Sequence, residues 1–163
     1  MFENLKKYNK ILVTGPQRSG TRIAAKMIAI DTGYDYIDEE CFNVSNRDKL
    51  REILKRDGIV VQCPAVSAWI QEFSTDNTLI VFMKRSIKDI LDSQKRIRWE
   101  QKTELAKYIR KKGVISKIKY ETWIKEQIQE IKNWIDLPYE SLDKHPLWIP
   151  KEKRLDFKYN QTE

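Results

Sequence analysis

The stretch LVTGPQRSGTR, Leu12–Arg22, decides the fold that the sequence predicts. An apolar run leads into Gly15, and a second glycine, Gly20, follows five positions later, just before a helical pattern begins. A glycine-rich turn between a strand and a helix leaves backbone N–H groups directed at an anion, at the positive end of the helix dipole. The stretch therefore predicts an anion-binding loop, in which Ser19 and Thr21 add hydroxyl donors.

The loop lacks the two residues with which an ATPase loop holds a magnesium-bound triphosphate. Thr21 stands at the position of the lysine, and Arg22 stands at the position of the magnesium-binding hydroxyl. No expected strand ends in an aspartate that would be a second magnesium anchor, since the most apolar strands run into Cys63 and Lys84. The sequence therefore predicts anion binding without a metal site, with Arg18 as the positive charge inside the loop.

Strands and helices alternate along the chain around this loop. Strands are expected at Lys10–Thr14, Tyr34–Ile37, Ile59–Gln62 and Thr78–Met83, and helices at Thr21–Ile30, from Ser45 to Gly58, after Pro64 and after Ser86. A later helix is expected to carry isoleucines at helical spacing, Ile124, Ile128, Ile131 and Ile135. The strands lack a polar alternate face, which is typical of a parallel sheet covered on both sides. The predicted fold is α/β, a three-layer P-loop-type domain with a mostly parallel sheet flanked by helices.

The length of 163 residues fits a single domain over residues 1–163, with a core at about 10–146 and a short basic tail. No apolar run approaches the ~20 residues that span a bilayer, and the first residues lack the apolar core of a signal peptide. Two cysteines and one histidine make neither a disulfide framework nor a zinc pattern. These features predict a cytoplasmic protein with no membrane span and no metal.

The net charge of +7 is concentrated in one segment, residues 84–119, which holds thirteen Lys and Arg against four acids. A basic segment favours a polyanionic partner, although a solvated helical face explains the same charges equally well. Aromatic side chains in or beyond it, Trp99, Tyr108, Tyr120 and Trp123, are candidates for stacking on a sugar or aromatic acceptor.

Two motifs resemble the sulfotransferase family. QRSGTR, Gln17–Arg22, is similar to the family's 5′-phosphosulfate loop, usually written PKSGTT or PRSGTT. VFMKRSIKDILDS places Arg85, Asp89 and Ser93 at the spacing of the family's RNPKDVAVS, which also follows a buried strand. The segments VVQCP and LPYESLDKHP add weaker similarity, so the resemblance covers most of the chain.

The resemblance implies a metal-independent sulfotransferase of P-loop-type fold that uses 3′-phosphoadenosine 5′-phosphosulfate. It would move a sulfuryl group to a hydroxyl or amine of a small-molecule or glycan acceptor, and nucleic acid is not the expected partner. Arg18 would stabilise the transition state, and Arg85 with Ser93 would hold the 3′-phosphate of the donor. The donor-binding residues would be Gly15, Pro16, Gln17, Arg18, Ser19, Gly20, Thr21, Arg22, Arg85 and Ser93.

The sequence departs from the family at the catalytic positions. Gln62 stands where many members have lysine, and Pro64 stands where the cytosolic enzymes have their catalytic histidine. A general base would then come from the acidic turn after the second strand, Asp38, Glu39 and Glu40, of which Glu39 and Glu40 are the candidates to test. His145 is expected to be a loop histidine rather than a base.

Two other functions remain open from the sequence. A nucleoside or small-molecule kinase would share the fold and the anion loop, although the missing lysine, hydroxyl and strand-end aspartate argue against it. A non-catalytic nucleotide- or polyanion-binding module would use the basic segment, and the substitutions at Gln62 and Pro64 are compatible with it. The acceptor and the oligomeric state are left undetermined.

Overall fold

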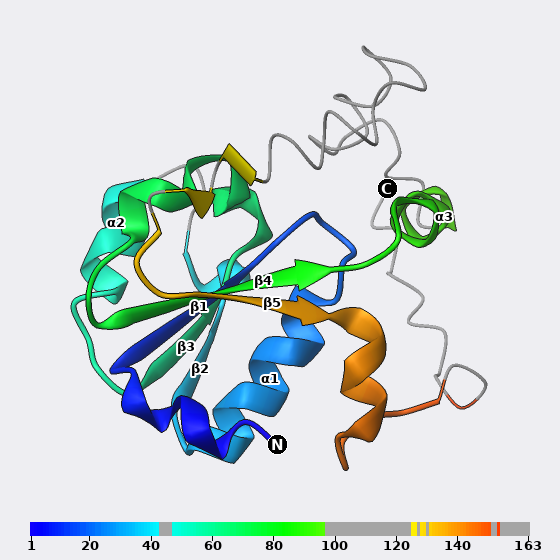
Figure 1. The fold of residues 1–163 in the computed structure, drawn as a ribbon, viewed down its shortest axis with the longest axis horizontal. Helices are drawn as coiled ribbons and strands as arrows, with labels where there is room; N and C mark the ends of the chain where they lie inside the picture. The colour runs from blue at the N-terminus through cyan, green and yellow to red at the C-terminus, as the bar shows by residue number, and fades with distance from the viewer. Residues whose placement is uncertain (43–46, 97–124, 127, 130, 151–152, 154–163) are drawn as a thin grey trace.

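The computed structural model of the chain describes residues 1–42, 47–96, 125–126, 128–129, 131–150 and 153. Within these residues, five parallel strands form one sheet in the order β2-β3-β1-β4-β5. The strands are β1 (Lys10–Thr14), β2 (Asp35–Asp38), β3 (Ile59–Gln62), β4 (Thr78–Lys84) and β5 (Trp134–Pro138). Because all of them run in one direction, their carboxyl ends meet at a single edge of the sheet, where ligands bind in such folds (Figure 1).

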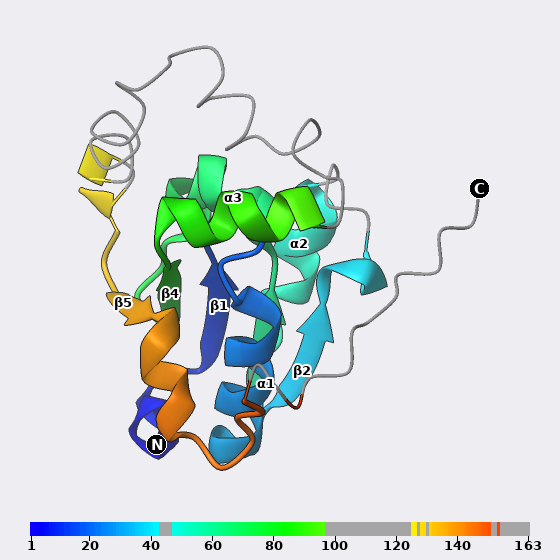
Figure 2. The same ribbon diagram turned by 90° about the vertical axis from the view of Figure 1, so that its right-hand side faces the viewer.

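Helices cover both faces of this sheet. One face is covered by α1 (Thr21–Thr32) together with the 3₁₀-helices η1 (Glu3–Lys7) and η5 (Tyr139–Lys144). The other face is covered by α2 (Arg47–Ile53) and the 3₁₀-helix η3 (Pro64–Phe73). Helix α3 (Ile87–Arg96) lies across the carboxyl edge of the strands (Figure 2). The predicted three-layer α/β fold with a parallel sheet is therefore confirmed.

The central strand β1 explains why the sheet needs two covering layers. Ile11 and Val13 contribute to the core on the α1 face, whereas Leu12 contributes to the core on the η3 face, and all three are fully buried. A strand buried on both faces reads as a continuous apolar run, which is why the sequence pattern identified it. The loop that follows β1 consequently emerges at the middle of the ligand-binding edge.

Strand β2 differs from the sequence expectation by one residue, and the difference matters for the site. It covers Asp35–Asp38 rather than Tyr34–Ile37, because Asp38 lies in register with Gln62 of β3. One strand therefore does end in an aspartate, and the Asp38 carboxylate pairs with Arg22. The 3₁₀-helix η2 (Glu39–Cys41) follows directly and carries the remaining acids of the turn.

The helix expected to extend through Ile135 was also wrong at its end. Ile135 belongs to β5, where it lies beside Val81 of β4, and Leu137 lies beside Met83. Isoleucines at helical spacing can still lie in a strand when a strand that is distant in the sequence, here β4, pairs with that segment. Pro138 is compatible with the strand because it is the last residue of an edge strand.

The cap predicted at Ser86 is confirmed. Its hydroxyl accepts the Asp89 N–H at 3.1 Å and donates to the Asp89 carboxylate at 2.7 Å. The similar cap at Ser45, the isoleucine at 124 and the aromatic residues at 99, 108, 120 and 123 lie outside the described residues, as does most of the basic segment. Among the helices that the structure does describe, none has the length and apolar character to cross a membrane.

Candidate functional site

The loop after β1 has the backbone of an anion cradle. Gly15, Arg18 and Gly20 all have positive φ, at 139°, 72° and 97°. A Cβ on Gly15 would lie 3.0 Å from the carbonyl oxygen of Met83, so glycine is needed for the loop to pack against β4. The loop enters α1 directly after Gly20, and the helix N-terminus therefore faces the sheet edge.

Two polar atoms at this site are buried without a hydrogen-bond partner. Ser19 is fully buried within the loop, and its Oγ has no partner. The Nε of Arg85, at the end of β4, is buried and unpaired as well. Orphaned donors of this kind are rare in proteins because each one costs about 1–3 kcal/mol. An anion on the loop, such as a phosphate or a sulfate, fits both of them.

The structure brings together three residues that the sequence analysis selected from distant segments. Arg18 Nε donates to Ser93 Oγ at 3.1 Å, and Arg85 Nη1 donates to the backbone carbonyl of Arg18 at 3.0 Å. The Arg85 guanidinium also lies 4.1 Å from the ring centre of Tyr139. Two guanidinium groups therefore converge on the loop, one from within it and one from β4.

The remaining predicted loop residues shape the backbone or are partly exposed. Pro16 is buried, and its carbonyl accepts the Ser19 N–H at 3.0 Å, which closes the tight turn. Gln17 is partly exposed at the tip of the loop. Thr21 is buried at the start of α1, so its hydroxyl lies where the lysine of an ATPase loop would begin.

Arg22 turns away from the anion loop and joins it to the acidic end of β2. Its Nε lies 3.0 Å from Asp38 Oδ2, and its Nη2 lies 2.8 Å from Glu40 Oε1. Asp38 also accepts the hydroxyl of Tyr36 and the backbone N–H of Glu40. Arg22 was expected to bind the donor, and in this structure its guanidinium pairs with Asp38 and Glu40.

The acids of this turn have opposite electrostatic surroundings. Partial burial alone would raise the pKa of Asp38, but the hydrogen bonds from Tyr36 and Glu40 N–H and the charge of Arg22 lower that pKa overall. Burial raises the pKa of the Glu39 carboxyl, and the neighbouring charge of Asp38 adds to the rise. Glu40 is exposed and ion-paired. Glu39 is thus the better placed of the two predicted bases, since opposite pKa shifts in neighbouring carboxyls separate a proton acceptor from a fixed charge.

Gln62, at the carboxyl end of β3, links the two halves of the site. Its side chain is buried, its Nε2 donates to Thr21 Oγ1 at 3.0 Å, and its Oε1 accepts the Glu39 N–H at a long 3.5 Å. In the sequence, Gln62 stands out only as a departure from a family pattern, with no role assigned to it. A polar residue that ends an otherwise apolar strand was the signal that could have identified it.

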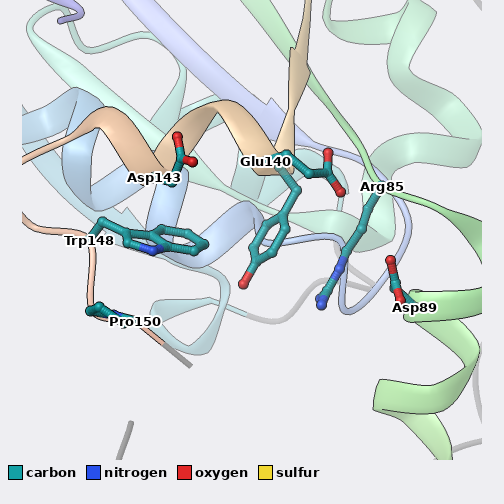
Figure 3. A pocket seen from close by; sticks show the side chains of 7 residues that line it. Arg85, Asp89, Glu140, Asp143, Trp148 and Pro150 are labelled. Carbon is teal, nitrogen blue, oxygen red and sulfur yellow. The ribbon is translucent and has the colours of Figure 1, made fainter. Parts of the chain in front are cut away.

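A pocket of about 410 Å³ opens beside the Arg85 end of the site (Figure 3). Figure 3 shows Arg85 and Asp89 on one side of the pocket and Trp148 and Pro150 on the other. Tyr139 connects the pocket to the loop, since a Cβ on Gly20 would lie 2.4 Å from its ring. The pocket is lined by Arg85, Asp89, Tyr139, Glu140, Asp143, Trp148 and Pro150.

His145 does not enter this site. His145 is buried after η5, where its Nε2 lies 3.1 Å from Asp31 and its Nδ1 accepts the Leu147 N–H. Cys41 is exposed and Cys63 is buried, and both are free thiols. Among the residues that the structure describes, no group of three or more His, Cys, Asp or Glu side chains is arranged to hold a metal ion.

Comparisons with known proteins support the fold. No protein-family model matches the chain, and no curated protein matches it. A shikimate kinase from Acinetobacter baumannii, solved with shikimate, is similar with a TM-score of 0.54 and 11% identity, over 84% of this chain and 88% of that one. The YorR protein from Bacillus subtilis, solved with phosphorylated GDP, has a TM-score of 0.50 and 12% identity, over 80% and 86%.

These similarities concern the fold alone, because the identities are low. They support a P-loop-type fold of the kind that kinases use, and they do not extend to the sulfotransferase family that the two motifs resemble. The chain has the α/β P-loop fold, with its glycine loop at the carboxyl edge of a parallel five-strand sheet.

Proposed function

We propose that this chain is a nucleotide-dependent transferase with the activity of a small-molecule kinase. The nucleotide would bind through its phosphates on the Gly15–Arg22 loop, and its nucleoside would lie toward the pocket beside Tyr139. The acceptor would be a small molecule with a hydroxyl group. One of the similar structures is a kinase solved with the small molecule shikimate, which favours phosphoryl transfer among the activities that this fold serves.

The observation that carries the proposal is the acidic end of β2 beside the loop. Arg22, the last residue of the Gly15–Arg22 loop, pairs directly with Asp38. A single side chain therefore connects the loop to the acids at the end of β2. A kinase needs both parts, a cradle for the donor phosphates and a carboxylate that orients or deprotonates the acceptor. A strand-end aspartate is therefore present in β2, although its carboxylate is paired with Arg22.

The reaction can be assigned to the side chains of this site. Glu39 would take the proton of the acceptor hydroxyl while the oxygen forms a bond to the terminal phosphorus and the bond to the bridging oxygen breaks. Arg18 and Arg85 would neutralise the charge that develops on the departing nucleoside diphosphate, in place of the missing lysine. Asp38 is already paired with Arg22, so magnesium would arrive with the nucleotide rather than on this carboxylate.

A sulfotransferase is the second candidate, and one contact favours it specifically. Arg18 and Ser93 are hydrogen-bonded to each other, and both belong to the motifs that resemble the donor site of that family. The donor would be 3′-phosphoadenosine 5′-phosphosulfate, with a hydroxyl or amine of a small molecule or glycan as acceptor. A sulfuryl group carries less negative charge than a phosphoryl group, so fixed guanidinium groups could stabilise its transfer without a metal.

Calorimetric binding of ATP and of adenosine 3′,5′-bisphosphate, each with and without magnesium, separates the candidates. A kinase binds ATP with magnesium more tightly than the bisphosphate. Tight binding of the bisphosphate without metal, with ATP much weaker, would replace the kinase by the sulfotransferase. Binding of neither nucleotide would contradict both and leave a non-catalytic module.

Arg85 gives a second test of the same choice. If Arg85 holds a 3′-phosphate, Arg85→Ala should weaken the bisphosphate about tenfold more than it weakens AMP, because a charge-assisted hydrogen bond is lost only for the former. If Arg85 serves the 5′-phosphates, both affinities fall equally. Lys84→Ala is the matched control, since Lys84 is the neighbouring cation but pairs with Asp136 away from the loop.

A further inference from the structure

Gln62 occupies a position where an apolar residue would be expected. It ends the strand Ile59–Gln62, whose other residues are isoleucine and valine with fully buried side chains. Its own side chain is 2% exposed, and Val13 of β1 lies beside it in register. Burying an amide in such surroundings is unfavourable unless each polar atom is hydrogen-bonded. The partners of Gln62 should therefore reveal why the amide is there.

Both partners of Gln62 belong to the candidate site, and they lie on opposite sides of it. On one side is the hydroxyl of Thr21, the first residue of α1, and on the other is Glu39. The Gln62 side chain also lowers the pKa of the Glu39 carboxyl, against the larger effect of burial.

The orientation of the amide follows from its neighbours. The backbone N–H of Glu39 can only donate, so it must face the amide oxygen, and the NH₂ group of Gln62 must face Thr21. Thr21 Oγ1 is then an acceptor toward Gln62, which leaves its own hydrogen available to donate elsewhere. An anion on the loop within reach of Thr21 Oγ1 would be an acceptor for that hydrogen.

We propose that Gln62 is a positioning residue that couples the anion loop to the general base, by fixing the Thr21 hydroxyl as a donor and holding Glu39 beside it. This inference rests on the proposed function for the identity of Glu39 as the base. Gln62 would thereby align the phosphate donor on the loop with the acceptor hydroxyl at Glu39, across the carboxyl end of β3 and without a metal ion between them. A loop that shifts on binding an anion would move Glu39 with it.

Other groups that face Glu39 must be considered in any test of this coupling. Asp38 and Glu40 raise the pKa of the Glu39 carboxyl by repulsion, and Arg22 lowers it. The thiol of Cys63 is also near, since the charge of Glu39 contributes to raising the Cys63 pKa. None of these groups is replaced in the Gln62 or Thr21 variants. A change in the pKa of Glu39 in the Gln62 variant would therefore result from the loss of the Gln62 amide.

The test uses the full chain and inorganic pyrophosphate, which probes the loop without requiring a known acceptor. Calorimetry of Gln62→Leu and Thr21→Val should each show pyrophosphate binding weakened by about tenfold, the effect of one lost hydrogen bond to a charged ligand. The double variant should bind no more weakly than the weaker single variant, because both changes break the same connection. If the losses of pyrophosphate affinity in the two single variants multiply in the double variant, the two residues act independently and the proposed coupling is wrong.

The titration of Glu39 gives a readout that a purely structural role would not change. An NMR pH titration of the Glu39 carboxyl should show a higher pKa in Gln62→Leu than in the wild type, because the polar Gln62 side chain, which lowers that pKa, is replaced by an apolar one. An unchanged titration together with unchanged pyrophosphate affinity would overturn the proposal. Gln71→Leu is the matched control, because Gln71 is an exposed glutamine in η3, outside the site.

A second variant of Gln62 covers the case in which the first does not fold. If Gln62→Leu does not fold, Gln62→Met fills the same space with a flexible apolar side chain, and the cycle with Thr21→Val is repeated on it. The coupling can also be separated from the proposed function. If the variants show the coupling but the wild-type chain transfers no phosphoryl group, the inference about Gln62 stands and the proposed function is wrong. If the chain transfers a phosphoryl group but the losses of pyrophosphate affinity multiply in the double variant, the proposed function stands and the inference is wrong.

Discussion

At the scale of single residues, Asp38 and Glu39 show how position decides chemistry. They are adjacent in the sequence and have similar side chains, yet the pKa of Asp38 is lowered and the pKa of Glu39 is raised. The difference lies in the partners, because Asp38 receives donors from Tyr36 and Arg22 whereas Glu39 is held in a more buried position. Only the first carboxyl is stabilised as an anion.

This difference predicts opposite dependences of stability on pH. The folded state holds the proton of Glu39 more tightly than the unfolded chain does, so ionisation of this carboxyl weakens the fold as the pH rises above about 4. Glu39→Gln cannot ionise, and its melting temperature relative to the wild type should rise between about pH 4 and pH 7. Thermal unfolding scans across this range would measure the difference.

Asp38→Asn is the control with the opposite sign. Its lowered pKa means that ionised Asp38 stabilises the fold above its usual pKa, and this contribution disappears as the pH falls through the lowered value. The variant should therefore be less stable than the wild type at about pH 7, with a deficit that shrinks in acid. Parallel curves for the two variants would contradict the assignment.

The two cysteines should differ sharply in reactivity. Burial raises the pKa of the Cys63 thiol to about 12, and the charge of Glu39 adds to the shift. The thiolate is the reactive form, so Cys63 should be inert at about pH 8 while the exposed Cys41 reacts. A colorimetric thiol reagent should label one thiol in the folded protein and two in urea. Rapid labelling of both thiols in the folded protein would show that Cys63 is accessible.

At the scale of elements, the junction between the loop and α1 depends on one glycine. Gly20 has a φ of 97°, and a Cβ there would lie 2.4 Å from the ring of Tyr139 in η5. Two requirements coincide, since both the backbone conformation and the close approach exclude a side chain. The position of η5, and with it one wall of the pocket, is set by this contact.

Gly20→Ala should therefore destabilise the chain by about 2 kcal/mol or more, through backbone strain and displacement of the Tyr139 ring. Gly33→Ala is the matched control, because Gly33 also has a positive φ, of 70°, but no atom lies within 4 Å of the added Cβ. Its cost should be about 1 kcal/mol, from strain alone. Urea unfolding would measure both, and equal losses would show that the contact with Tyr139 is not tight.

At the scale of the whole molecule, two hydrophobic clusters on opposite faces of the sheet hold the site together. Leu12 belongs to the cluster on the η3 face, and Val13 belongs to the cluster on the α1 face. Because both clusters meet at β1, a cavity in either one loosens the strand from which the anion loop emerges. Stability and anion binding are therefore coupled through this strand.

Leu12→Ala should lower the free energy of unfolding by about 2–5 kcal/mol, since the side chain is fully buried and a cavity would remain. Ile30→Ala is the control, because Ile30 of α1 is 62% exposed and its truncation should cost about 0.5 kcal/mol or less. Chemical denaturation would compare them. A small effect at Leu12 would mean that the sheet can collapse around the missing atoms.

The sequence by itself determined the parts of this protein that are encoded locally. The glycines of the Gly15–Arg22 loop, the apolar runs of β1, β3 and β4, and the cap at Ser86 all follow from backbone preferences and burial within a few residues. The spacing of Arg85 and Ser93 follows in the same way, because a helix of known start places the two side chains. These elements suffice to predict the P-loop-type fold.

Only the tertiary structure decided which side chains face one another. The pairing of Arg22 with Asp38, the link from Thr21 through Gln62 to Glu39 and the approach of Tyr139 to Gly20 all join residues from different elements. Ile135 was assigned to a helix for the same reason, since its place in β5 depends on β4 lying beside it. Partners of this kind depend on the order of strands in the sheet, and no local pattern in the sequence encodes that order.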